Sequence, residues 1–106
     1  MEIQFYHDRV PERSHSMKRV VVTVIGVDKV GIIAGVSGGL ADHGVNILTV
    51  SQAIVDGIFN MVLMCDMEGA SDTLEQIQKD MGDIGRRLGV EVRVQLADVF
   101  YAMHRI

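Results

Sequence analysis

One stretch of the sequence restricts the fold more than any other: a strand-like run that is apolar on both faces. Residues 20–25 read Val-Val-Val-Thr-Val-Ile, so only Thr23 interrupts the run. Such a strand suits the centre of a sheet that is covered on two sides. A glycine-flanked loop follows directly, and a helical pattern then continues until His43-Gly44, where a glycine is typical of the position just beyond a helix. The chain is therefore predicted to contain a central strand with a helix packed directly after it.

A hairpin is predicted in the middle of the chain. Residues 45–55 and 58–67 are both strand-like, and Asp56-Gly57 separates them. A two-residue Asp-Gly connection is typical of a tight hairpin, because both turn positions need a left-handed backbone.

A second helix is predicted after the hairpin. Asp72 with Glu75 three residues later forms a plausible capping box at its start, and Gly89 closes it. Apolar residues recur along it at helical spacing and predict one buried stripe: Leu74, Ile77, Met81, Ile84 and Leu88. In the first helix we expect the corresponding stripe to be Ile33, Val36 and Leu40.

The chain ends with a strand and a short helix. Residues 90–96 alternate between apolar and polar side chains, which indicates an edge strand with one solvated face. The apolar residues Val99, Met103 and Ile106 fit a short helix docked on the domain. The predicted order is strand, helix, strand, strand, helix, strand, which is the α+β ferredoxin-like βαββαβ sandwich: a four-stranded antiparallel sheet with two helices on one face, here with a short C-terminal helix added.

This fold leaves one sheet face without helices, yet the returning hairpin strand is apolar on both sides. Five of its side chains point one way: Phe59, Met61, Leu63, Cys65 and Met67. Three point the other way: Ile58, Val62 and Met64. Another subunit, the N-terminal segment or the C-terminal helix must cover the second set. We expect a homodimer, with self-capping as the alternative.

Composition narrows the function classes. The 106 residues carry a formal net charge of −4, which argues against a general nucleic-acid binder or an anionic-membrane binder, because either needs a basic surface. Cys65 is the one cysteine and cannot form an internal disulfide. We find no apolar leader and no run long enough to span a membrane, so the expected location is cytoplasmic.

The first 17 residues differ in composition from the rest. They contain the only proline of the chain, and Met17 could serve as a second start. We therefore divide the chain into an N-terminal extension, residues 1–17, and one domain, residues 18–106. Within the extension, residues 2–7 could add a strand to a sheet edge or lie on a partner subunit.

The loop between the first strand and the first helix is the candidate binding site. Residues 26–31 read Gly-Val-Asp-Lys-Val-Gly. A helix start leaves backbone N–H groups unpaired, and together with the helix dipole they attract small anions. The glycines are not spaced for a dinucleotide, and no Lys-Ser/Thr pair is present for a triphosphate. The alternative is that they only form a tight turn.

The same residues carry a resemblance to a known family. The run from Val22 to Ala34 (VTVIGVDKVGIIA) resembles the opening of ACT domains, and LADHGVNIL from Leu40 to Leu48 matches the same pattern. The hairpin and the ending FYAMHRI are similar to the short stand-alone ACT proteins of bacteria and archaea, and to the ACT halves of glycine-cleavage-system repressors. The resemblance covers residues 18–106.

The resemblance implies a regulatory module that binds a small amino acid between two subunits. The ligand carboxylate would meet backbone donors of the first loop, and the partner's second strand would complete the site. The implied ligand-binding residues are Asp28, Val30, Gly31, Ile32, Ile33, Asn46, Ile47 and Ser51. Two of them have structural alternatives: Asp28 could cap the helix, and Asn46 could satisfy local backbone groups.

Other classes fit less well. Acylphosphatases need an arginine in the first loop, RNA-recognition motifs need sheet aromatics and a basic surface, and heavy-metal-binding domains of this fold need Cys-x-x-Cys there. The first loop contains neither the arginine nor Cys-x-x-Cys, and Phe59 is the only candidate sheet aromatic in a chain that lacks a basic surface. We therefore expect no enzyme, no cofactor, no metal site and no nucleic-acid or membrane partner. Because no second domain is predicted in the chain, an effector bound here would regulate a separate, unidentified protein partner. The main alternative is a dimerisation or scaffold protein without a ligand.

Overall fold

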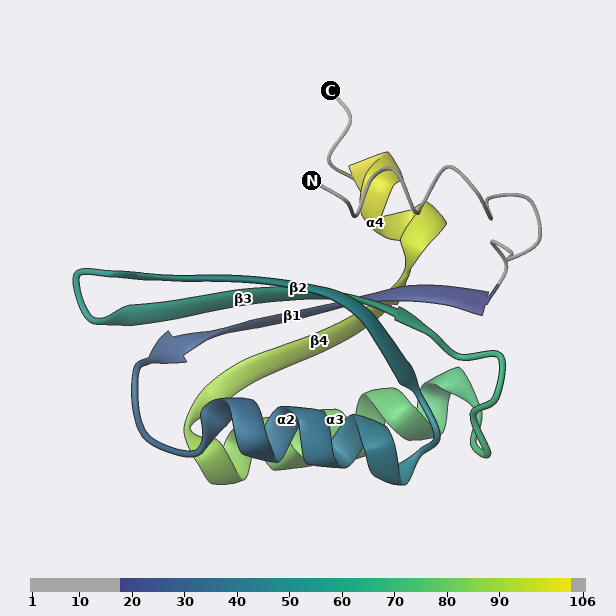
Figure 1. Cartoon of the computed structure of the whole chain (residues 1–106), viewed down its shortest axis with the longest axis horizontal. Coiled ribbons are helices and arrows are strands. Elements are labelled where there is room, and N and C mark those ends of the chain that lie inside the picture. The colour runs from purple at the N-terminus through teal and green to yellow at the C-terminus, as the bar shows by residue number, and fades with distance from the viewer. Residues whose placement is uncertain (1–17, 104–106) are drawn as a thin grey trace.

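The computed structural model describes residues 18–103, and the predicted element order is confirmed (Figure 1). The predictions for the N-terminal extension, including a strand over residues 2–7, lie outside the described residues. The elements are, in chain order, β1 (Arg19–Val27), α2 (Ile32–Asp42), β2 (Asn46–Val55), β3 (Ile58–Asp66), α3 (Leu74–Leu88), β4 (Val90–Leu96) and α4 (Ala97–Met103).

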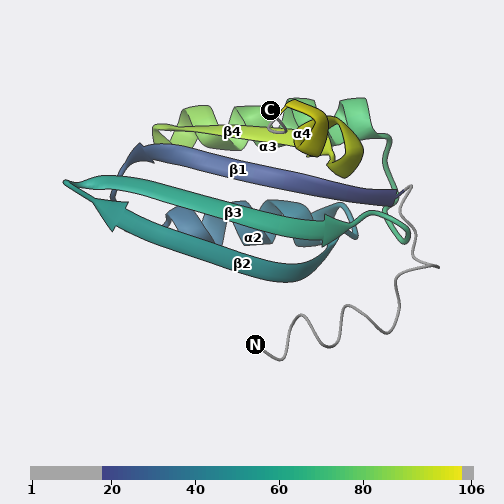
Figure 2. The ribbon, with the colours of Figure 1, turned by 90° about the horizontal axis from the view of Figure 1, so that it is seen from above.

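The four strands form one antiparallel sheet in the order β2-β3-β1-β4 (Figure 2). This order places β1 at the centre, as its two apolar faces predict, and β2 and β4 at the edges. Val27, at the end of β1, lies opposite Ile58, which lies opposite Val55. At the other end of the sheet, Arg19 lies opposite Asp66, which lies opposite Asn46. The register therefore fixes which loops share an end of the sheet.

The helices α2 and α3 cover one face of the sheet and enclose the core (Figure 1). Aliphatic and sulfur-containing side chains from both layers fill it, with Phe59 as its one aromatic residue: Val20, Val22, Val24, Val36, Leu40, Met61, Leu63, Cys65, Ile77 and Met81 belong to it. The predicted stripe of α3 is confirmed, because Ile77 and Met81 are buried and the other three residues pack against the core.

Two local predictions were wrong by one residue. The stripe of α2 contains Ile32, which is buried, and not Ile33, which is 46% exposed, because the helix begins at Ile32 and its first residue turns toward the sheet. The predicted capping box of α3 is also wrong: the N-cap is Thr73, whose Oγ1 accepts a hydrogen bond from the Gln76 backbone N–H at 3.1 Å.

The predicted turns are confirmed. Asp56 and Gly57 both have positive φ, at 51° and 80°, as a tight two-residue hairpin requires. Gly44 after α2 and Gly89 after α3 have φ of 76° and 79°, and this left-handed conformation is the reason why glycine ends both helices.

The C-terminal helix α4 lies on the face opposite α2 and α3 (Figure 1), and contacts β1 and β4. It was predicted to dock through Val99, but that side chain is 45% exposed. Instead Ala97 is buried and Phe100 lines a hollow on the sheet. The predictions for the side chains of Met103 and Ile106 lie outside what the structure describes.

Candidate functional site

The loop between β1 and α2 forms an open corner. Gly31 is the N-cap of α2, with a φ of 95°, and no side chain caps the helix. The predicted capping role of Asp28 is therefore not seen; its backbone N–H donates to the Gly57 carbonyl at 3.0 Å instead. Uncapped amides at a helix start remain available to water or to an anion.

The space beside Gly31 is open. A Cβ on Gly31 would meet no atom within 4 Å, so the left-handed backbone, and not lack of space, favours glycine there. Val30 is 98% exposed, whereas Ile32 is buried in the core. Ile32 can therefore contribute only its backbone amide to a site, while Ile33 stays half-exposed beside it.

The predicted strand residues lie elsewhere. Asn46 is at the opposite end of the sheet from the corner, and eight residue steps along β1 correspond to about 26 Å. Ile47 is half-buried and packs against the core. Ser51 is exposed near the middle of β2 and lies opposite Val62. A single copy of the chain therefore does not bring Asn46 and the corner together.

The edge strand β2 is unusually open. All its residues beyond Val50 are exposed, and so is Val50 itself. Ile54 is paired with Phe59 and Val50 with Leu63, so both belong to the helix-covered face, yet each is more than half exposed. A long apolar edge with unpaired backbone groups favours pairing with another strand.

Sequence reasoning missed a polar cluster at the other end of the sheet. His43, buried just beyond α2, has Nδ1 at 2.5 Å from an Asp72 carboxylate oxygen and Nε2 at 3.0 Å from one of Asp80. Its carbonyl accepts from the Ser71 backbone N–H at 3.0 Å. We call His43, Asp72 and Asp80 the clasp, because they tie the end of α2 to α3 and to the loop before it. Its members are far apart in sequence, and no local pattern indicates the contact.

The thiol of Cys65 is fully buried in the core. Burial raises the pKa of the Cys65 thiol to about 12, so the thiol is protonated and unreactive at neutral pH. In residues 18–103, no three His, Cys, Asp or Glu side chains are grouped to hold a metal ion. The described helices also include none that is long and apolar enough to cross a membrane.

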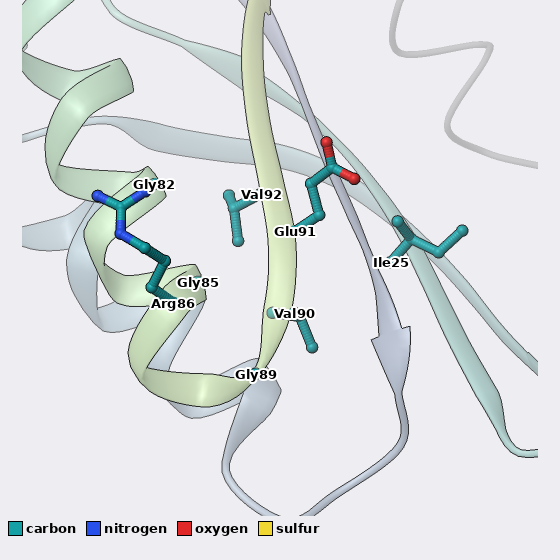
Figure 3. Close-up of a pocket in the computed structure, with 8 residues that line it drawn as sticks. All are labelled: Ile25, Gly82, Gly85, Arg86, Gly89, Val90, Glu91 and Val92. Carbon is teal, nitrogen blue, oxygen red and sulfur yellow. The ribbon is translucent and has the colours of Figure 1, made fainter.

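A hollow of about 480 Å³ lies along the outer edge of β4 (Figure 3). Three glycines of the α3 region, Gly82, Gly85 and Gly89, line it. Its charged side chains, Arg86 and Glu91, lie on either side of the strand (Figure 3). Because they do not converge, they do not form a reactive pair, and the exposed Arg86 in the last turn of α3 complements the helix dipole, as its position predicts.

Comparison with known proteins agrees with this fold and shows the family. The family model described as ACT domain matches residues 18–95. A UPF0237 protein from Methanocaldococcus jannaschii is 46% identical over 90 residues, which are 85% of this chain and all of that protein. The structure of an ACT domain protein from Streptococcus pneumoniae is 34% identical, with a TM-score of 0.70 over 81% of this chain and 97% of that one.

A more distant structure shares the fold. It is assigned to a glycine cleavage system transcriptional repressor and is 18% identical, with a TM-score of 0.64 over 73% of this chain and 44% of that one. The resemblance predicted from the loop and the hairpin is thus confirmed. The chain belongs to the ACT domain family, whose members are regulatory ligand-binding modules.

Proposed function

We propose that this protein binds a small amino acid at the interface of a homodimer and regulates a separate protein partner in the cytoplasm. The observation that carries the proposal is the start of α2 at Gly31: an uncapped helix that opens onto solvent beside an exposed apolar edge strand. A carboxylate placed there would accept hydrogen bonds from the first amides of α2 and would be stabilised by the helix dipole.

The second copy supplies what one chain lacks. If two β2 strands pair antiparallel about a two-fold axis, Asn46 of one copy lies beside Val55 of the other. Val55 is at the same end of the sheet as the open corner. The partner's Asn46 side chain could then donate to or accept from the ligand, and Asp28 could pair with its ammonium group. Val50 and Ile54, exposed in one copy, would be buried between the two.

Thermal unfolding of the full chain against each of the twenty amino acids, at about 10 mM, tests the proposal. A ligand with a dissociation constant near 0.1 mM would be at about a hundredfold excess and would stabilise the fold by about 2.7 kcal/mol. In a domain of this size that raises the midpoint by roughly ten degrees. A panel in which no amino acid raises the midpoint would contradict the proposal and favour the scaffold alternative.

A variant pair links the response to the corner. Gly31→Val places a branched side chain where the carboxylate would approach, and we expect it to abolish the response. Gly31→Ala is the matched control, because it places a much smaller side chain at the same left-handed position, where a Cβ meets no other atom within 4 Å. Both substitutions carry similar backbone strain, so a response lost in both variants would assign the effect to strain and not to the site.

A further inference from the structure

The sheet face opposite α2 and α3 has a covered half and a bare half. α4 lies over the covered half (Figure 1), where Val21 is buried. In the bare half, four β-branched side chains of the two central strands point to the same side and are 39–61% exposed: Ile25, Val27, Ile58 and Val62. A solvated sheet face normally carries polar residues, so residues 18–103 leave an apolar patch that calls for a cover.

The size of this bare half favours a short occupant. With strands about 4.8 Å apart and residues about 3.3 Å apart, a patch of four strands and four residues measures roughly 250 Å². A specific contact between two separate chains needs roughly 800 Å² from each partner. A segment of the same chain needs less area, because its attachment keeps its effective concentration high and reduces the entropy cost of docking.

The N-terminal extension has the length and the attachment point to reach the bare half. It joins the domain at Lys18, whose carbonyl accepts a hydrogen bond from the Met67 backbone N–H at 2.8 Å. From Arg19 to Ile25 the distance along β1 is about 20 Å. The 14 residue steps from Phe5 to Arg19 can span up to about 46 Å. The extension is therefore long enough to reverse its direction and return over the sheet.

The sequence of the extension also matches the patch. Ile3 and Phe5 are two positions apart, so an extended backbone would place both side chains on the same side. The bare half contains a hollow of about 460 Å³, lined by Ile25, Val62 and Phe100 among others. A phenyl ring in this hollow would contact aliphatic side chains and form an aromatic pair with Phe100.

We propose that residues 2–7 lie across the bare half of their own copy, with Phe5 in the hollow beside α4 and Ile3 against the neighbouring aliphatic side chains. We call residues 2–7 the cover segment. The family match begins at residue 18, so the cover segment is an addition to the shared domain. It leaves the exposed edge of β2 free, and the homodimer and ligand site of the proposed function do not depend on it.

Methyl NMR spectra of the full chain test the position of the cover segment. Phe5→Glu replaces the ring with a charge and should shift the methyl signals of Ile25 and Ile58, while the signal of Ile77, buried on the other side of the sheet, stays in place. Gln4→Glu is the matched control, because it adds the same charge one position away, where an extended backbone points to the opposite side. Unchanged signals of Ile25 and Ile58 in Phe5→Glu, or equal shifts in both variants, would overturn the proposal.

A second measurement separates the cover segment from a second copy of the chain. Nuclear Overhauser effects between the Phe5 ring and the methyl groups of Ile25 or Ile58 are expected in the unmodified chain, with the same intensity relative to the diagonal at two protein concentrations that differ tenfold. Their absence would overturn the proposal, and so would a loss on dilution, which would assign the contact to another copy. Both measurements are made without an amino acid, so their failure is distinct from failure of the proposed ligand site.

Discussion

The two ends of the sheet are built differently. At one end, the clasp of His43, Asp72 and Asp80 joins both helices, and the side chain of Thr73 caps α3. At the other end, the corner at Gly31 has no side-chain cap, and Val30 is almost fully exposed. We call these the clasped end and the open end. Polar side chains therefore pair with one another and with backbone groups at the clasped end, whereas the first amides of α2 at the open end have no side-chain cap.

The largest expected effect is a pH dependence of the free energy of unfolding that is caused by Cys65. This residue is buried at the clasped end, where it lies opposite Val20 and Ile47. Its pKa is raised from 9.0 to about 12 because burial disfavours the thiolate. The folded chain therefore holds its proton between these values while the unfolded chain loses it. The resulting stability is fully present below about pH 9 and falls by about 1.4 kcal/mol per pH unit above it.

Urea unfolding at pH 8, 9, 10 and 11 would measure this dependence. Cys65→Ala is the control, because it removes the titrating group and should remove this part of the slope. An equal slope in both proteins would show that the thiol is not sealed from water.

Removing the clasp should have the next largest effect. We expect His43→Ala to lower the free energy of unfolding by about 2 kcal/mol, because hydrogen bonds to charged groups contribute roughly 1.5–3 kcal/mol and both carboxylates are partly solvated. Urea unfolding combined with Asp72→Ala in a double-mutant cycle would isolate the coupling between the two side chains. Additive effects of the two substitutions would contradict the clasp.

Removing the cap of α3 should cost less. Thr73→Ala deletes the hydroxyl that accepts from the Gln76 amide, and such a change costs about 1 kcal/mol. Thr73→Ser keeps the acceptor and should remain close to the original protein in thermal unfolding. If the two variants were equally destabilised, the methyl group and not the cap would be responsible.

The smallest effect on stability is expected at the open end. Asp28 is exposed and makes no side-chain hydrogen bond in the described structure, so Asp28→Ala should change the free energy of unfolding by less than about 0.5 kcal/mol. The proposed pairing with a ligand ammonium group predicts that the same variant loses most of the thermal response to the amino acid. A clear loss of stability without ligand would remove the contrast between the two ends.

The comparison also separates what the sequence can predict from what it cannot. The Asp56-Gly57 turn and the glycines after both helices follow from local backbone requirements, and the hydrophobic spacing predicts the order of helices and strands along the chain. The exact start of each helix was predicted one residue away from its observed position. Ile32 and not Ile33 lies in the core, and Thr73 and not Asp72 is the cap.

The clasp itself could not be predicted, because the residues that meet His43 come from a different helix and the loop before it. Asp72 has the residue type and the spacing of a helix cap, but tertiary packing pairs it with His43 instead. The same limit applies to the site: the open corner follows from its loop sequence, but the separation of Asn46 from it follows only from the sheet register.

The central claim is that the open end binds a ligand through the first backbone amides of α2, which no side chain caps. At the clasped end, the side chain of Thr73 already accepts from an amide at the start of α3. The most direct measurement is a backbone amide NMR spectrum of the ¹⁵N-labelled full chain, recorded with and without an equimolar mixture of the twenty amino acids. We predict shifts at residues 31–34 and none at residues 73–76. Unchanged signals at residues 31–34, or equal shifts at both helix starts, would contradict the account.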